Sequence, residues 1–290
     1  MSWRTVVVSK RCKLDFKMNY MVIRGEETTR IFLDEIALVI IENPAVAITG
    51  CLLEALAAKK IKVIFCNSKR SPYGELLTYY GSFDCPKKQR MQIAWGSEIK
   101  DYIWKLVIQE KILNQARLLC DSGMQKEGLM LEGYAEAVEP GDLSNREGHA
   151  AKVYFNALFG MEFKRSDDSL PINALLDYGY SILLSAFNRA VCSNGYSTIF
   201  GIHHDNVHNC YNLSSDLMEP YRSLVDRCVK EKKLEVLDKD SKYAIVNILN
   251  STVNIRNSNQ TVLNSIEIYV KSVFNALNTG DIEDIMFYNL

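Results

Sequence analysis

The sequence lacks the features of an exported or membrane-spanning protein. Its first residues, MSWRTVVVSKRCK, contain no apolar core of a secretory signal. IALVII at 36–41 is among the longest apolar runs, and it is far too short to cross a bilayer. The eight cysteines include no C-x-x-C pair, which excludes a zinc ribbon and a thioredoxin motif. We therefore expect a cytoplasmic protein with reduced thiols and no membrane partner.

The chain also lacks a strong excess of charge of either sign, because its formal net charge is −1. The balance is uneven along the chain: residues 1–90 carry a net charge of +6, and residues 91–290 carry −7. Two domains with different surfaces would show this pattern, and so would a basic part that meets a polyanion beside an acidic part that holds cations. Charge alone therefore does not identify a nucleic-acid-binding protein.

Hydrophobic periodicity divides the chain into a β-rich first part and a helical second part. Short β-branched and aromatic runs predict strands at 5–10, 13–25, 30–42, 62–67 and 74–84, with one helix at 52–60. Later apolar residues recur every three or four positions, which predicts helices at 97–121, 144–159, 172–194, 220–233 and 261–278. We predict an α+β protein with a small N-terminal domain, residues 1–85, resembling a β-sandwich or β-roll. A larger all-helical catalytic domain, residues 86–290, follows it, and the boundary lies between Tyr80 and Ala94.

Three of the four histidines lie within six positions, in the segment GIHHDNVH at 201–208. On paper His203, His204, His208 and Cys210 supply the four nitrogen and sulfur ligands that zinc needs, but their spacing matches no known zinc motif. One histidine combined with carboxylates around Mg²⁺ or Mn²⁺ is the second interpretation. A polar loop that is merely rich in histidine is the third.

Two carboxylates and a guanidinium follow this loop, at Asp216, Glu219 and Arg222. Their spacing of three residues would place them on one face of a helix, which suits a metal ion next to a phosphodiester. Pro220 disfavours helical geometry at the residue before it. A helix that begins at Pro220 with Glu219 as its cap explains the same spacing without any site.

The segment DLSNREGHAAKVYFNALFG at 142–160 is the second candidate. Ser144 and Glu147 form a capping-box pattern before an apolar helical run, which is the structural explanation for this glutamate. Two features favour a functional role instead. Arg146 and His149 make the helix start unusually polar, and the small residues around Gly148 let another element approach closely.

Five segments, in this order and at this spacing, resemble the CRISPR-associated endonuclease and integrase of the spacer-acquisition complex, the "Cas one" family. They are KILNQ at 111–115, NREGHAA at 145–151, PINALLDYGYSILL at 171–184, GIHH at 201–204 and SDLMEPYR at 215–222. The wording of SNREGHAA, LDYGY and DLMEPYR is most similar to type II-A systems, which use a single RNA-guided effector nuclease. The β-first, helix-second layout agrees with the same family.

The resemblance implies a site for Mg²⁺ or Mn²⁺ held by Glu147, His204 and Glu219. Asp216 matches an accessory catalytic carboxylate, and Arg222 matches a basic residue that faces phosphate. Many relatives have aspartate where Glu219 stands, and the resemblance favours His204 over His203 as the ligand. The remaining candidates for DNA contact are Arg146, the basic patch with Lys87, Lys88 and Arg90, and the basic N-terminal strands.

The resemblance further implies a metal-dependent DNA endonuclease and integrase that acts in antiviral defence. Its reaction would be transesterification, in which the 3′-hydroxyl of a prespacer DNA attacks a phosphodiester at a CRISPR repeat boundary. The implied partners are double-stranded DNA, a second copy of the chain and a small ferredoxin-like second Cas subunit; the RNA-guided effector nuclease is a further candidate. Two alternatives remain open from the residues: a metal-dependent DNA-repair nuclease without integration, and a non-catalytic helical scaffold.

Overall fold

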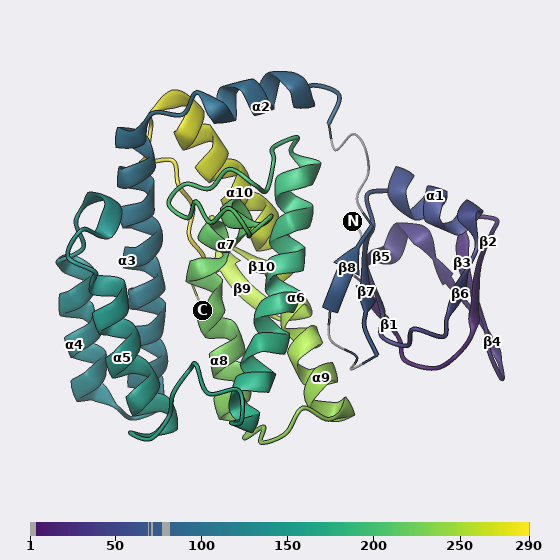
Figure 1. The fold of residues 1–290 in the computed structure, drawn as a ribbon, viewed down its shortest axis with the longest axis horizontal. Coiled ribbons are helices and arrows are strands. Elements are labelled where there is room, and N and C mark those ends of the chain that lie inside the picture. Colours follow the sequence, from purple (N-terminus) through teal and green to yellow (C-terminus); the bar gives the residue numbers. More distant parts are fainter. Residues whose placement is uncertain (1–3, 69, 71, 77–81, 290) are drawn as a thin grey trace. The chain divides into compact units, whose positions relative to one another are not determined.

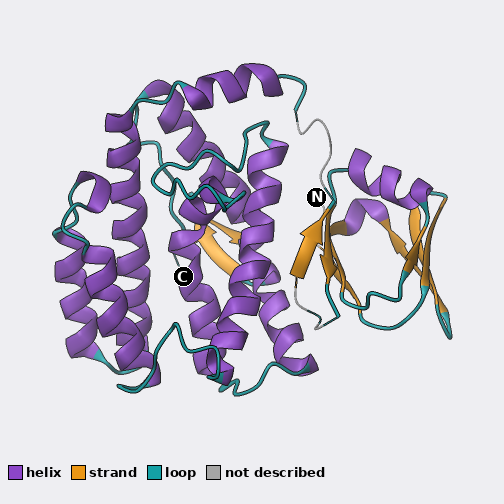
Figure 2. Ribbon diagram, viewed as in Figure 1, coloured by secondary structure: helices purple, strands orange, loops and turns teal. Residues whose placement is uncertain are grey.

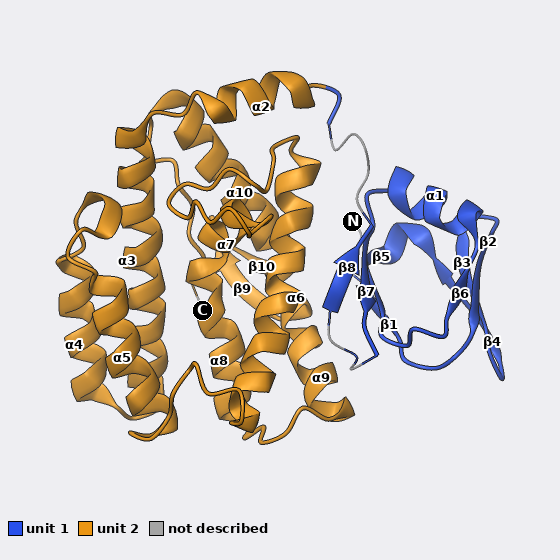
Figure 3. Cartoon of the chain, viewed as in Figure 1, with its two compact units in different colours: residues 1–83 blue, residues 84–290 orange. Residues whose placement is uncertain are grey.

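The computed structural model describes residues 4–68, 70, 72–76 and 82–289, and the chain divides into two compact units. The first unit spans Met1–Phe83 and the second spans Asp84–Leu290 (Figure 3). The first is rich in strands and the second is helical, so the predicted α+β class is confirmed. Assigning catalysis to residues 86–290 stays a prediction.

Two four-stranded sheets form the first unit, and Figure 2 shows them with a helix at one end. One sheet has the order β1 (Arg4–Val8), β5 (Ile36–Ile41), β7 (Lys62–Cys66), β8 (Pro72–Glu75), with β1, β5 and β7 parallel and β8 antiparallel to β7. The other has the order β4 (Thr28–Phe32), β3 (Tyr20–Arg24), β2 (Lys13–Lys17), β6 (Ala47–Ile48). The short helix η1 (Leu33–Glu35) and helix α1 (Gly50–Ala58) complete the unit.

The core of the first unit lies where apolar side chains of both sheets and of α1 pack together, among them Val39, Met21 and Leu52. All six residues of β5, IALVII, are buried, as expected of a strand paired on both sides with parallel neighbours. The strand predicted at 74–84 overlaps only the end of β8. Its residues 77–81 lie outside the described residues, and helix α2 begins at Cys85.

The second unit consists of helices and one hairpin. In chain order its elements are α2 (Cys85–Ile93), α3 (Ser97–Asp121), α4 (Gln125–Glu136), η2 (Pro140–Asp142), α5 (Arg146–Phe159), α6 (Pro171–Ser193), α7 (Asn212–Met218), η3 (Glu219–Tyr221), α8 (Arg222–Glu231), α9 (Lys239–Val246), η4 (Asn247–Asn250), β9 (Thr252–Ile255), β10 (Ser258–Thr261) and α10 (Val262–Thr279). The helix at 97–121 has the predicted bounds. The sequence did not predict α4, α9 or the β9–β10 hairpin. Among the described helices, none has the length and apolar character needed to cross a membrane.

Helix α3 is the central element of the second unit, since it packs against α4, α5, η3 and α8. Figure 1 shows α3, α4 and α5 lying side by side. The buried face of α3 includes the apolar residues Val107, Ile108 and Ile112. Two polar residues of the same helix, Lys111 and Asn114, are also buried. Because charged side chains are rarely buried without a partner, the buried Lys111 indicates that acidic side chains lie next to it.

Candidate active site

One buried ammonium group joins two glutamates that lie far apart in the sequence. Nζ of Lys111, on α3, lies 2.5 Å from Oε1 of Glu147 and 2.5 Å from Oε2 of Glu219. Glu147 comes from the first turn of α5 and Glu219 from η3. The lysine therefore holds three helical segments at one point and places two of the predicted site residues together.

The start of α5 explains why the Glu147 side chain is available for this contact. The helix is capped by Asn145, which adopts the left-handed conformation at φ 50° and accepts a hydrogen bond from the Gly148 N–H at 3.1 Å. The Asp142 carboxylate accepts the N–H groups of the first two helical residues at 2.8 and 3.0 Å, the second being that of Glu147. The capping box predicted for Ser144 and Glu147 is therefore wrong, because Asn145 and Asp142 satisfy these donors.

Glu219 lies within helical backbone and does not cap a helix. Its φ of −52° and ψ of −45° continue the turn from α7 into η3, so the alternative in which Glu219 caps a helix that begins at Pro220 is wrong. The Pro220 carbonyl accepts hydrogen bonds from the Asn114 side chain and the Tyr288 hydroxyl, each at 3.1 Å. These tertiary bonds stabilise a short 3₁₀ turn in place of a helix break.

Both carboxylate oxygens of Glu219 are engaged by cations. Nε and Nη2 of Arg222 each lie 2.9 Å from Oε1, while Lys111 takes Oε2. Burial alone would lower the pKa of Lys111, but the charges of Glu219 and Glu147 outweigh it and raise this pKa above its ordinary value. Burial would raise the pKa of Glu219, yet Arg222 and Lys111 hold it below the usual range. The group is therefore a charged cluster at neutral pH.

Asp216 organises the histidine loop. Its carboxylate is fully buried and accepts the backbone N–H groups of Ile202 at 2.6 Å, His203 at 2.9 Å and His204 at 3.2 Å. Nδ1 of the His204 ring also contacts it, and this contact raises the pKa of His204 above its ordinary value. A side chain at Gly201 would lie 2.2 Å from the His204 carbonyl, so the loop needs glycine there. Asp216 thus positions His204 and leaves Nε2 for other contacts.

The three clustered histidines have three different environments. The His203 ring stacks on Trp104 at 4.4 Å with an angle of 1°, whereas His204 meets the same indole edge-on at 5.6 Å. His208 and Cys210 are exposed. Among the residues that the structure describes, no group of three or more histidine, cysteine or acidic side chains is arranged to hold a metal ion. The four-ligand zinc interpretation therefore has no support in this arrangement.

The two glutamates nevertheless fit a hard divalent ion. Their oxygens face one nitrogen at 2.5 Å each, so they lie within about 5 Å of each other. Carboxylate oxygens with one imidazole are donors that Mg²⁺ and Mn²⁺ accept. The contact with Asp216 is the main cause that raises the pKa of His204, and the charges of Glu219 and Glu147 add to it. The position between the carboxylates already holds positive charge, which is supplied by Lys111.

A third buried carboxylate, Asp226, supports the arginine of the cluster through Tyr180. The hydroxyl groups of Tyr154 and Tyr180 donate to Asp226 at 2.7 and 2.5 Å. Burial raises the pKa of Asp226 to about 6, although both hydroxyl donors act to lower it. The guanidinium of Arg222 lies 4.7 Å from the centre of the Tyr180 ring. The chain Asp226–Tyr180–Arg222 therefore supports Glu219 at Oε1, while Lys111 contacts Oε2.

The basic residues predicted to contact DNA lie on α2 and at the start of α5. Lys87 and Arg90 are exposed on α2, and Lys88 pairs with Asp84 at 3.1 Å. Arg146 is the first residue of α5, directly before Glu147. The Gln92 side chain of α2 donates to the carbonyls of residues 197 and 200 at 2.8 and 3.0 Å, which ties this helix to the segment leading into the histidine loop.

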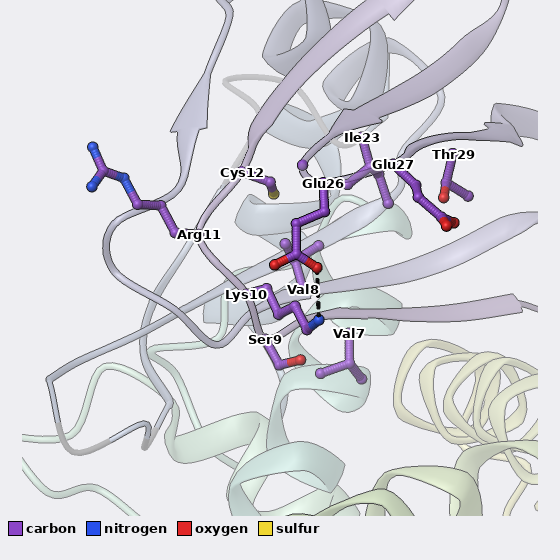
Figure 4. A pocket seen from close by; sticks show the side chains of 11 residues that line it. Val7, Val8, Ser9, Lys10, Arg11, Cys12, Ile23, Glu26, Glu27 and Thr29 are labelled. Carbon is purple, nitrogen blue, oxygen red and sulfur yellow. Dashed lines mark hydrogen bonds and ion pairs between the residues drawn. The ribbon is translucent and has the colours of Figure 1, made fainter.

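A cavity of about 700 Å³ in the first unit differs in character from this site (Figure 4). It is lined by the end of β1, the segment after it and the turn between β3 and β4. Lys10 and Glu26 face each other there at 3.5 Å between Nζ and Oε2 (Figure 4). Acidic and basic side chains balance each other in this cavity, so it offers no field of one sign to a metal or a polyanion.

Two carboxylates that converge on one cation are oxygen donors of the kind that a hard divalent metal ion prefers. Residues 5–232 match the family model described as CRISPR associated protein Cas1, and the chain belongs to this family. The family predicted from the five sequence motifs is thereby confirmed.

Similar proteins carry the corresponding names. The chain is 32% identical over 279 residues to the CRISPR-associated endonuclease Cas1 of Neisseria meningitidis serogroup C (strain 8013), covering 94% of this chain and 91% of that protein. It is 28% identical over 219 residues to the CRISPR-associated endonuclease Cas1 1 of Pyrobaculum aerophilum, covering 69% and 72%.

Solved structures share the fold. A structure described as a casposase bound to integration product aligns with a TM-score of 0.78 at 18% identity, covering 97% of this chain and 92% of that one. A chain of a Cas6-RT-Cas1--Cas2 complex aligns with a TM-score of 0.74 at 18% identity, covering 97% of this chain and 36% of that one. The fold is therefore shared by proteins of quite different sequence.

Proposed function

We propose that this chain is a CRISPR adaptation integrase and endonuclease, which joins the 3′-hydroxyl of a prespacer DNA to a CRISPR repeat boundary. The observation that carries the proposal is the convergence of Glu147 and Glu219 on one cation position. Asp216, three residues before Glu219, fixes the third proposed ligand, His204. The similar proteins named CRISPR-associated endonuclease Cas1 support the activity, and the structure with an integration product supports the reaction. The motif wording supports a type II-A system.

In this proposal Glu147, His204 and Glu219 hold Mg²⁺ or Mn²⁺, which when bound polarises the phosphoryl oxygen and activates the attacking hydroxyl. Asp216 orients the His204 ring through Nδ1, so that Nε2 is the ligand nitrogen. Arg222 holds the Glu219 carboxylate and adds positive charge where a phosphate would develop negative charge.

DNA is held in this proposal by contacts to phosphate, which carry no base specificity. Arg146 lies beside Glu147 at the helix start, and Lys87, Lys88 and Arg90 extend a basic surface on α2. Affinity should therefore fall with salt, and each lysine replaced on α2 should reduce the salt slope by about one unit.

The proposed assembly contains two copies of the chain and a small ferredoxin-like second Cas subunit, with the RNA-guided effector nuclease as a further partner. A structural relative was described in a Cas1--Cas2 complex, which supports the second subunit. In the first unit β1 stands at the edge of its sheet, and such edges pair readily with another chain. We expect sedimentation to show a dimer at micromolar concentration. Because the proposed substrate is chromosomal DNA, we propose that the protein acts in the cytoplasm.

The decisive experiment incubates a 3′-hydroxyl duplex with a supercoiled repeat plasmid, the partner subunit and Mn²⁺. We expect branched, joined DNA that disappears with EDTA and with Glu147→Ala, while the exposed-residue control Glu132→Gln retains full activity. His204→Ala should remove joining, whereas His203→Ala and His208→Ala should each retain a fraction. Cut DNA without joining would favour the repair nuclease. Joining that persists in the Glu147 and His204 variants would overturn the proposed site.

A further inference from the structure

We propose that Lys111 is an internal counter-ion that occupies the cation position between Glu147 and Glu219 in the metal-free protein and withdraws when a divalent ion binds. The inference rests on the proposed metal site and assigns a role to a residue outside its ligand set.

The first step is that the two glutamates need a cation in order to stand together. The Glu219 side chain is 4% exposed and the Glu147 side chain 31% exposed, and their oxygens lie within about 5 Å. Two like charges this close disfavour each other's ionised form. The Lys111 ammonium, 11% exposed, lies within 2.5 Å of an oxygen of each glutamate and so fills the position between them before any metal arrives.

The second step is that a divalent ion and the ammonium cannot share the position. Nζ lies 2.5 Å from an oxygen of each glutamate, and Mg²⁺ binds its oxygen ligands at about 2.0–2.1 Å. An ion held by both oxygens would therefore occupy nearly the space that Nζ occupies. The formal charges also balance already, because Lys111 and Arg222 neutralise the two carboxylates.

Of the two cations around Glu219, Lys111 is the one that can move. Arg222 is fixed on two sides, by two nitrogens at 2.9 Å from Glu219 and by the Tyr180 ring at 4.7 Å. The ammonium of Lys111 stands on a flexible four-carbon stem, which can turn away without moving α3. Its partner Glu147 is the more exposed carboxylate, so the cluster opens to solvent on that side. Metal affinity is therefore reduced by an internal competitor.

The test measures Mn²⁺ binding by calorimetry, without DNA, in the wild type, in Lys111→Met and in Lys126→Met, an exposed lysine of α4 that serves as the control. We expect Lys111→Met to bind Mn²⁺ at least about tenfold more tightly, since a competing unit charge is removed. We also expect it to melt at a lower temperature without metal and to gain more from added Mn²⁺ than the wild type. The control should match the wild type.

The outcomes separate this inference from the proposed function. If the wild type binds Mn²⁺ in a Glu147-dependent manner but Lys111→Met binds no more tightly, the counter-ion role is wrong and the metal site stands. If neither protein binds Mn²⁺, the metal site itself fails, and the counter-ion role fails with it.

A measurement on the wild type covers the case in which Lys111→Met does not fold. Acetylation of lysines by acetic anhydride, mapped by mass spectrometry, reports how accessible each amine is. We expect labelling of Lys111 to rise several-fold with saturating Mn²⁺ while labelling of Lys126 is unchanged. Equal or lower labelling of Lys111 with Mn²⁺ would show that the ammonium stays in place, which overturns the proposal.

Discussion

The start of α5 and the segment from α7 to α8 each give one glutamate to Lys111, but they give it under different conditions. Glu147 is 31% exposed, and the backbone around it is capped by other residues. Glu219 is 4% exposed and holds Lys111 with one oxygen and Arg222 with the other. Among the described residues, the Glu147 side chain therefore has one structural contact, to Lys111, whereas Glu219 keeps both the buried Lys111 and the partly buried Arg222 in place. Replacing Glu147 should therefore remove activity with little loss of stability, whereas replacing Glu219 should reduce both.

The same segment carries two further buried carboxylates with structural duties. Asp216 accepts three backbone N–H groups of the histidine loop, and Asp226 accepts two tyrosine hydroxyls. A chain of polar contacts thus runs through α7, η3 and α8, while α5 contributes two side chains to it, Glu147 and Tyr154. Changes in the two regions should differ in how strongly they affect unfolding.

The largest loss of stability should follow from Glu219→Ala. Removing this carboxylate leaves the buried Lys111 ammonium with Glu147 alone and leaves Arg222 without its ion-pair partner. Breaking a buried pair of this kind costs about 3–5 kcal/mol in the free energy of unfolding. Urea denaturation should show it, with the exposed Glu235→Ala as the control. A decrease in the free energy of unfolding below about 1 kcal/mol would mean that Glu219 stabilises the protein no more than a surface ion pair does.

Asp216→Ala should have the next largest effect. It removes the acceptor of three backbone N–H groups, those of Ile202, His203 and His204, of which Ile202 is buried. An unsatisfied buried donor costs about 1–3 kcal/mol, so we expect a loss of about 2 kcal/mol or more, together with faster proteolysis of the loop. Asp216→Asn keeps an oxygen acceptor and should recover part of the stability. Equal losses in both variants would contradict the loop-holding role.

Asp226 predicts a pH dependence of intermediate size. Its pKa is raised from 3.8 to about 6 in the folded protein, so the folded state binds the proton more tightly than the unfolded state. The stabilisation is complete below pH 3.8 and is lost as the pH rises through about 6. Between pH 7 and pH 5 the wild type should gain about 1 kcal/mol relative to Asp226→Asn, which cannot titrate. Parallel pH profiles for the two proteins would exclude a titrating Asp226.

Sequence patterns predicted the helices that carry the site better than they predicted the contacts between those helices. The three- and four-residue spacing along 97–121 predicted α3 with its bounds, because local periodicity determines a long amphipathic helix. The same spacing places Lys111 within the apolar face, and a lysine at a core position is a readable sign of a buried partner. Which partner it meets depends on tertiary packing between α3, α5 and η3, and no local pattern contains that information.

Two structural alternatives that the sequence left open failed for the same physical reason. The caps expected at Ser144 and Glu219 follow from short-range preferences, which tertiary contacts override at both places. At the start of α5, Asn145 and Asp142 accept the N–H groups that Ser144 was expected to cap. At Glu219, hydrogen bonds to the neighbouring Pro220 carbonyl keep the residue within a helical turn. Asp226 was missed because its two tyrosine partners come from α5 and α6.

Glu147→Ala should have the smallest effect on stability and the most complete effect on joining. The variant removes one partly exposed partner of Lys111, and the ammonium keeps its bond to Glu219. Asn145 and Asp142 continue to satisfy the helix start, so we expect the free energy of unfolding to fall by less than about 1 kcal/mol. Strand joining should be lost all the same, since the proposed metal ligand is gone. A large drop in melting temperature with joining retained would place Glu147 among the structural residues and remove the distinction between the two regions.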